Sequence, residues 1–142
     1  MKRFLFLVSI IIWIGCAAKE EAKPTIIIQK SNTQKRSEMA TLMLLMYETN
    51  AENKQLILEG KQPKEFPEEF LKIHTAKFTD ATDNTESFKV YSEIYLKNLK
   101  QVFEPSKESL KSKHNITINS CIACHQTTCI GPIPKIKKLL IQ

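Results

Sequence analysis

Glycine is scarce in this chain. It occurs three times among 142 residues, and no glycine-rich turn of the kind that binds phosphate groups is present. There is no arginine-rich run and no alternation of basic with aromatic residues, so nucleic acid is not an expected partner. A nucleophile–base signature and a carboxylate pair at an informative spacing are also missing. These absences predict that the protein is not an enzyme.

Long apolar runs are missing as well. The stretch from Leu5 to Ile14 has ten residues, whereas a membrane-spanning helix needs about 20. It follows Lys2-Arg3, as in a secretory signal peptide, and it ends in Gly15-Cys16, which resembles the lipobox of bacterial lipoproteins. We therefore expect residues 1–15 to be a lipoprotein signal peptide and Cys16 to carry the lipid that holds the protein on a membrane. A plain cleaved signal peptide with a chance cysteine is the alternative.

The next segment, residues 16–30, is expected to be a lipid-anchored tether. Lys19-Glu20-Glu21 resembles an export tag that sends some lipoproteins to the cell surface, and a solvated polar tether is the alternative. Either way the predicted location is extracytoplasmic, on the periplasmic or the surface-exposed side of an outer membrane. The only candidate strand, Thr25–Ile28, lies in this tether.

Residues 31–142 are long enough for one domain with one core. Helical spacing predicts the first helix from the capping box at Ser31–Gln34 to Glu59, with Gly60 as its stop. A short second helix, from Pro67 to about Lys77, is expected to bury Phe70 and Leu71, with His74 either packed beside them or at the surface.

Two further helices follow. The third has the clearest pattern, with apolar residues every three or four positions up to Pro105: Phe88, Tyr91, Tyr95, Leu99 and Val102. The fourth is expected from Ser106 to about His125. The predicted fold is therefore all-α, an up-down-up-down four-helix bundle with a short second helix.

The stretch from Ser120 to Cys129, SCIACHQTTC, contains C-x-x-C-H. A Cys121–Cys124 disulfide would enclose almost no loop, so it would add little stability, and it would leave His125 unexplained. Zinc would have four ligands of the right types if Cys129 joined them, but His125 follows Cys124 directly and cannot easily reach the same ion.

Covalent haem accounts for the whole motif. Cys121 and Cys124 would form thioethers with the porphyrin, and the imidazole of His125 would reach the iron from one face, as in c-type haem attachment. Positions 121, 124 and 125 are spaced i, i+3 and i+4, so a helix presents all three on one side. Attachment of this kind takes place outside the cytoplasm, where the signal peptide would send the chain.

A second axial ligand from the protein must come from upstream, because neither methionine nor histidine follows His125. In the expected bundle the end of the last helix lies beside the early turns of the first. His114 lies about three turns, roughly 16 Å, back along the last helix, which favours a structural role. The candidate ligands in order of preference are Met43, Met46 and Met39, with His74 expected to be packed or at the surface.

An export signal and C-x-x-C-H at the end of a last helix resemble the class II c-type cytochromes, the cytochrome c′ and c556 group. The resemblance covers roughly residues 31–125 and implies a haem between the first and last helices. It implies that Met43 or Met46 completes the iron, as in the c556 type, and that Arg36 lies close to a haem propionate. In the c′ type the distal side chain is not a ligand and the iron is five-coordinate.

The residues beyond this region, 129–139, are similar to the C-terminus of small monohaem lipoproteins of the same plan. Cys129 stands where the family commonly has a basic residue, and we expect it to be a partly buried thiol. The three lysines that follow, Lys135, Lys137 and Lys138, are expected in a solvated tail that could also meet propionates or an acidic redox partner.

The function expected from these features is electron transfer by a lipid-anchored monohaem cytochrome c, with a redox partner protein. The alternative is a five-coordinate haem protein that binds a small gas such as NO or CO. Because class II bundles often pair, the resemblance also raises a homodimer as an expectation.

Overall fold

The structure is a computed structural model that describes residues 36–106 and 108–142. The expected signal peptide, the tether with Cys16 and the Thr25–Ile28 strand, and the capping box at Ser31–Gln34 lie outside the described residues.

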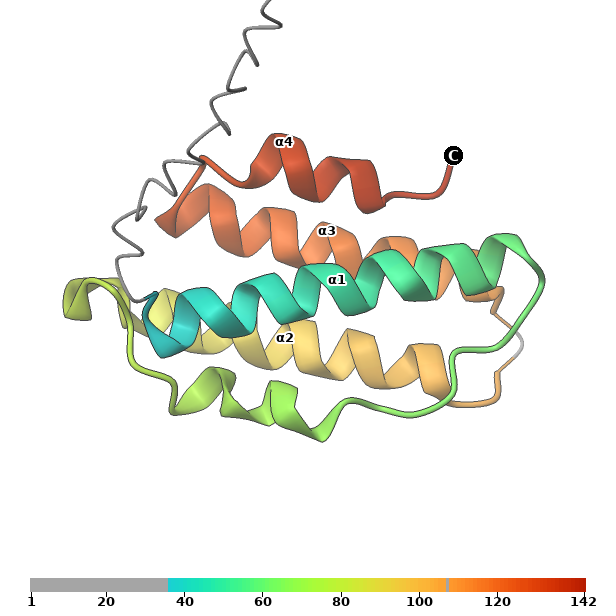
Figure 1. The fold of residues 1–142 in the computed structure, drawn as a ribbon, viewed down its shortest axis with the longest axis horizontal. Helices are drawn as coiled ribbons and strands as arrows, with labels where there is room; N and C mark the ends of the chain where they lie inside the picture. Colours follow the sequence, from blue (N-terminus) through green and yellow to red (C-terminus); the bar gives the residue numbers. More distant parts are fainter. Residues whose placement is uncertain (1–35, 107) are drawn as a thin grey trace, which may run out of the picture. The chain divides into compact units, whose positions relative to one another are not determined.

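Every regular element in the described part of the chain is a helix (Figure 1). The α-helices are α1 (Glu38–Leu58), α2 (Glu86–Phe103), α3 (Leu110–Thr128) and α4 (Ile133–Ile136), and the 3-10 helices are η1 (Glu68–His74), η2 (Ala81–Asp83) and η3 (Lys137–Leu139). The predicted all-α class is confirmed. Among these helices, none combines the length and the apolar character that crossing a membrane requires.

Helix α1 starts later than the sequence suggested. The Ser37 hydroxyl accepts a hydrogen bond from the Ala40 amide at 3.0 Å and caps the helix, which begins at Glu38. The predicted end is confirmed: Gly60 has a φ of 72°, and the amides of Gly60 and Lys61 donate to Ile57 and Leu56. This is a Schellman ending, in which glycine supplies the left-handed residue.

The expected second helix is a 3-10 helix, η1, and it is shorter than predicted. Phe70 is buried as expected, but its buried partner is Ile73. Leu71 is exposed, so the prediction that it belongs to the core is wrong, and His74 takes the surface position of its two predicted alternatives. The cause is the tighter winding of the 3-10 helix, in which positions three apart share a face.

Helix α2 follows the predicted pattern. Thr85 caps it, and Phe88, Tyr95, Leu99 and Val102 are buried, whereas Tyr91 is half-buried.

Helix α3 starts at Leu110, four residues after the predicted Ser106. The Ser109 hydroxyl accepts from the Ser112 amide and caps the helix. The Ser106 hydroxyl accepts from the Glu108 amide and so belongs to the turn before it. At its other end the helix continues beyond the predicted His125 to Thr128.

The last residues are not a solvated tail. Ile136, Leu139 and Ile141 are buried, and the first two pack against Ile118 of α3. Only the ammonium groups of this segment behave as predicted, since Lys135, Lys137 and Lys138 are exposed.

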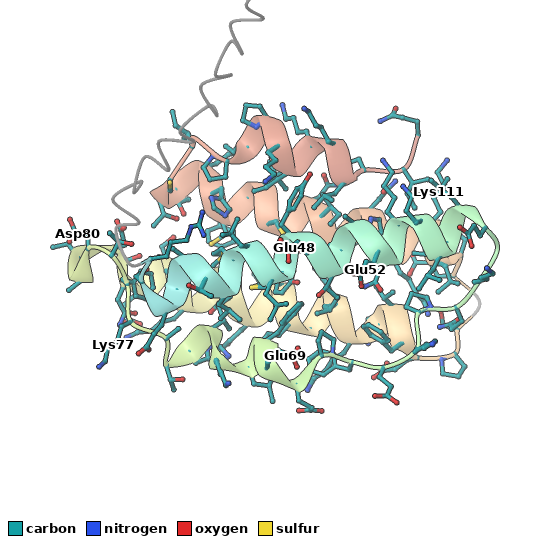
Figure 2. All side chains as sticks on the ribbon, in the orientation of Figure 1. Glu48, Glu52, Glu69, Lys77, Asp80 and Lys111 are labelled. Carbon is teal, nitrogen blue, oxygen red and sulfur yellow. The ribbon has the colours of Figure 1, made fainter. Side chains whose placement is uncertain are left out.

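The start of α1 and the end of α3 lie at the same end of the structure (Figure 1). The Met39 amide donates to Lys77 O at 3.0 Å, and the Thr79 hydroxyl donates to Ser37 Oγ at 2.9 Å. These bonds hold the segment after η1 against the first turn of α1. Most charged side chains lie on the outside, among them the labelled Glu48, Glu52, Glu69, Lys77 and Asp80 in Figure 2, whereas Lys113 is buried.

Replacement of Gly60 by alanine tests the ending of α1. Nothing lies within 4 Å of a Cβ at this position, so the left-handed backbone is the cause of any loss. We expect the free energy of unfolding to fall by about 1 kcal/mol, measured by urea denaturation. Gly131→Ala is the matched control, because its Cβ would also meet open space and its φ is not positive. Equal stabilities of the two variants would contradict the role of Gly60.

Candidate functional site

A cavity of about 460 Å³ lies at the end of the structure where α1 begins and α3 ends. Its walls come from the first half of α1, the first half of α2, the end of α3 and the C-terminal segment, and most of the side chains are apolar. The volume falls within the range of about 300–1,000 Å³ that is typical of small-molecule and cofactor sites.

Helix α3 brings its motif residues to this cavity together. Cys121, Cys124 and His125 all border it, as the i, i+3, i+4 spacing predicts. The helix is regular there, and the hydroxyls of Thr127 and Thr128 both donate to Cys124 O at 2.8 Å. These bonds hold both threonine side chains against the last turn of α3.

The ring of His125 is fixed by the backbone of Cys129. Its Nδ1 lies 2.9 Å from Cys129 O, and the Cys129 amide donates to His125 O at 3.0 Å. Because a carbonyl can only accept, Nδ1 carries the proton in this bond. In the neutral ring Nε2 is then the nitrogen with a free electron pair, which is the state a metal ligand requires.

The two motif thiols are protonated at neutral pH. Burial raises the pKa of Cys121 to about 12, and the neighbouring Cys124 adds to that effect. Burial also raises the pKa of Cys124, while the Thr128 hydroxyl lowers it. Cys121 is half-buried and borders the cavity.

Three methionines of α1 line the same cavity. Met39 and Met46 are buried and belong to the core cluster, whereas Met43 is only partly buried and packs against that cluster. The three occupy one face of α1 at spacings of three and four residues, as predicted. Met43 is therefore the methionine that the core constrains least.

One polar pair borders the cavity among these apolar side chains. The Asn50 amide donates to Met46 O at 2.7 Å and to the Tyr95 hydroxyl at 3.1 Å, and its Oδ1 has no protein partner. Burial raises the pKa of Tyr95 well above its usual value, with the Cys121 thiol as a second cause. The phenol therefore remains protonated.

Charged groups border the cavity on several segments. Arg36 precedes α1, Asp83 ends η2, and Lys135 belongs to α4. The Lys135 ammonium lies 4.3 Å from the centre of the Tyr47 ring, a cation–π contact. The two cations outnumber the single carboxylate, so the cavity suits a ligand with an apolar body and an anionic edge.

The other sequence candidates lie elsewhere. His114 is fully buried, and its Nε2 bonds to Leu139 O at 3.0 Å, which confirms a structural role. His74 is exposed beside a different groove. Cys129 borders the cavity, but it is exposed, so the prediction of a partly buried thiol is wrong. It ends α3, where the chain turns outward.

The three cysteines of the described region, Cys121, Cys124 and Cys129, are free thiols. Within residues 36–106 and 108–142, no three side chains of the kinds that ligate metals form a group able to hold an ion. A zinc site built from these cysteines and His125 has no support in the structure.

Sequence reasoning missed part of the cavity wall. Ile136 and Leu139 line it from the C-terminal segment, and Asn50 and Tyr47 line it from α1. Ile133, Ile136 and Leu139 recur every three residues, a signal for a packed 3-10-like segment that the neighbouring lysines and prolines obscure. No signal in the sequence pairs Asn50 with Tyr95.

Comparison of the chain with protein-family models, with curated proteins and with solved structures gives no match. The chemistry of the cavity is therefore the support for any function.

The raised pKa of Cys121 predicts slow alkylation in chains that carry no cofactor. A thiol with the usual pKa of 9.0 has about 1,000 times more thiolate at pH 8 than one with a pKa of about 12. With Cys121 as the only cysteine, we expect alkylation by iodoacetamide to rise about tenfold per pH unit up to pH 11. A chain with only the exposed Cys129 should react much faster at pH 8. Comparable rates at pH 8, followed by mass spectrometry, would show that Cys121 is not buried.

Proposed function

We propose that this protein is a monohaem c-type cytochrome that transfers electrons. The observation that supports it is the convergence of Cys121, Cys124, His125 and the α1 methionines on one apolar cavity. Such a haem supplies an iron that gains and loses one electron, and the chain supplies its attachment, its ligands and its exclusion from water.

The residues present fit this group. The two sulfurs that would form thioethers lie one turn apart on the same helix and border the cavity. His125 has its Nδ1 proton bonded to Cys129 O, so Nε2 is available to the iron. Arg36 and Lys135 supply positive charge where an anionic propionate would be stabilised.

The distal ligand in this proposal is Met43. Met39 and Met46 are 6% exposed each and packed in the core, so turning either sulfur toward an iron would remove it from that packing. Met43 borders the cavity and contacts the core only partly. Met46 is the second choice, because it lies one turn further along the same face.

The fold in this proposal is the up-down-up-down four-helix plan of the class II c-type cytochromes, with η1 as its second member. Two adjacencies support it: the chain after η1 bonds to the start of α1, and α3 packs along α2. We further propose the lipid anchor at Cys16, an extracytoplasmic location on the outer membrane, and a redox partner protein. Homodimer formation belongs to the same proposal.

Removal of the thioether positions tests haem attachment. Cys121→Ala combined with Cys124→Ala should abolish covalent haem in cells that carry a haem-maturation system, measured by haem stain and by the mass of the intact protein. Cys129→Ala is the matched control and should retain it, because position 129 contributes a backbone carbonyl to His125. Covalent haem on the double variant would contradict the proposal.

The distal site is tested by optical spectra with and without CO. A methionine ligand predicts low-spin spectra that CO leaves unchanged, and Met43→Ala should give a ferrous form that binds CO, with a lower reduction potential. Met46→Leu is the control: it keeps the buried volume, removes only the sulfur, and should resemble the parent. If the parent protein is high-spin and binds CO, gas binding replaces electron transfer as the proposed function of this cavity.

A further inference from the structure

The C-terminal segment is a wall of the cavity as well as a packed end of the chain. Residues 132–142, here called the strap, contain α4, η3 and the last three residues. Four of them line the cavity: Pro132, Lys135, Ile136 and Leu139. Any movement of the strap therefore changes access to the cavity.

Besides its buried apolar side chains, the strap is held by hydrogen bonds that α1 and α3 donate mainly to its backbone carbonyls. Lys54 of α1 donates to Lys138 O and Leu140 O, both at 2.8 Å. Asn115 of α3 exchanges two hydrogen bonds of 2.9 Å with Ile141. Lys111, labelled in Figure 2, donates to Gln142 O at 2.7 Å, near the end of the chain (Figure 1).

His114 makes the one strap contact that depends on its own protonation between pH 5 and 8. Its Nε2 is 3.0 Å from Leu139 O, and because that oxygen can only accept, Nε2 carries the proton. The other nitrogen, Nδ1, is buried and has no partner. The side chain is 0% exposed, so a second proton on Nδ1 would place an unpaired charge in the interior.

The charged surroundings do not compensate for that charge. Burial lowers the pKa of His114, the bond to Leu139 O raises it by less, and the nearby Lys54 lowers it further. Neither ring nitrogen bonds to a carboxylate. Charged groups on the elements around it include Lys111 and Lys113 on α3, Lys135, Lys137 and Lys138 on the strap, and Glu104 after α2, and the carboxylates Glu48 and Glu52 of α1 and Glu93 of α2 are exposed.

We propose that the strap is a gate: it closes one side of the cavity while His114 is neutral, and it separates from α3 when His114 takes up a second proton. Separation removes Leu139 from the ring and exposes Nδ1 to water. It also removes four lining residues from the cavity, so a small solute gains access to the bound cofactor from that side.

The direction of the pH effect follows from linkage. With the strap open, His114 has its ordinary pKa of 6.5, and with the strap closed its pKa is lower. The closed state is therefore fully favoured above pH 6.5 and loses stability as the pH falls below it. At pH 5.0 the ratio of closed to open strap should have fallen by up to about 30-fold, the limit for an open-state pKa of 6.5.

Hydrogen exchange of the mature protein tests the gate. The Ile141 amide donates to Asn115 Oδ1 of α3, so it reports on the separation of the strap from α3. After correction for intrinsic exchange rates, its protection should fall between pH 7.5 and pH 5.0, while amides in the middle of α2 keep theirs. Strap protection that is equal at the two pH values would overturn the proposal.

Two histidine variants identify the titrating group. The amide of His114→Gln can still donate to Leu139 O but does not titrate, so strap protection should no longer depend on pH. His74→Gln is the matched control at an exposed histidine outside the strap and should behave like the parent. If His114→Gln does not fold, Lys111→Met serves: it removes the bond to Gln142 O and leaves the Asn115 acceptor of the Ile141 amide in place, so it should lower Ile141 protection at both pH values and leave the pH dependence intact. A pH-independent strap in Lys111→Met, or a pH-dependent one in a folded His114→Gln, would contradict the gate.

The consequence for the cofactor rests on the proposed function, but the gate itself does not. If haem is attached, CO should bind faster at pH 5.0 than at pH 7.5 in a Met43→Ala background, and His114→Gln should remove that difference. If no haem is found, the cytochrome proposal is wrong, and hydrogen exchange still tests whether the strap opens with falling pH. If haem is present and strap protection does not depend on pH, only the gate proposal is wrong.

Discussion

The separation of α1 from α3 is the constraint on which the rest of the structure depends. Helix α3 packs closely along α2 and approaches α1 at far fewer places. Helix α1 is held at its start by the segment around Lys77 and, further along, by Lys54, which bonds to the strap. Both attachments run through other segments, so α1 and α3 stay apart at one end and the cavity lies between them.

This arrangement divides the chemistry of the cavity between two helices. The end of α3 supplies two thiols and an imidazole from adjacent turns, and the start of α1 supplies methionine side chains from one face of the helix. Each set follows from helical spacing alone. The two sets meet because the start of α1 and the end of α3 lie at the same end of the structure (Figure 1).

The sequence predicted the parts of the site that lie within single helices. Phe88, Leu99 and Val102 define α2 because apolar residues recur there at helical spacing, and C-x-x-C-H defines one face of α3 for the same reason. Boundaries were less predictable, since Ser106 and Ser109 are both able to cap α3. Only the three-dimensional path of the chain decides that Ser106 bonds within the preceding turn.

The burial of the strap was missed, and the burial of Ile73 in η1 was missed beside the correctly predicted Phe70, for a different reason. Both have apolar residues three apart, among lysines or glutamates that suggest an exposed surface. Their burial comes from tertiary contacts. Ile136 and Leu139 pack against Ile118, and Phe70 and Ile73 pack in the core cluster with residues of α1 and α2. The bond between His114 and Leu139 joins residues 25 positions apart, and no local sequence pattern predicts a pair so far apart.

The path of the chain also determines where the strap can pivot. Cys129 is tied to His125 by two hydrogen bonds, and a pivot at Cys129 would break the bond that orients the imidazole. The next two residues are restrained less: Ile130 is 71% exposed, a Cβ on Gly131 would meet open space, and the backbone bond across them is the one from the Ile133 amide to Ile130 O. A pivot at residues 130 and 131 allows the strap to move while Cys129 O stays on Nδ1. The orientation of His125 and the opening of the cavity are thereby separated by two residues of chain.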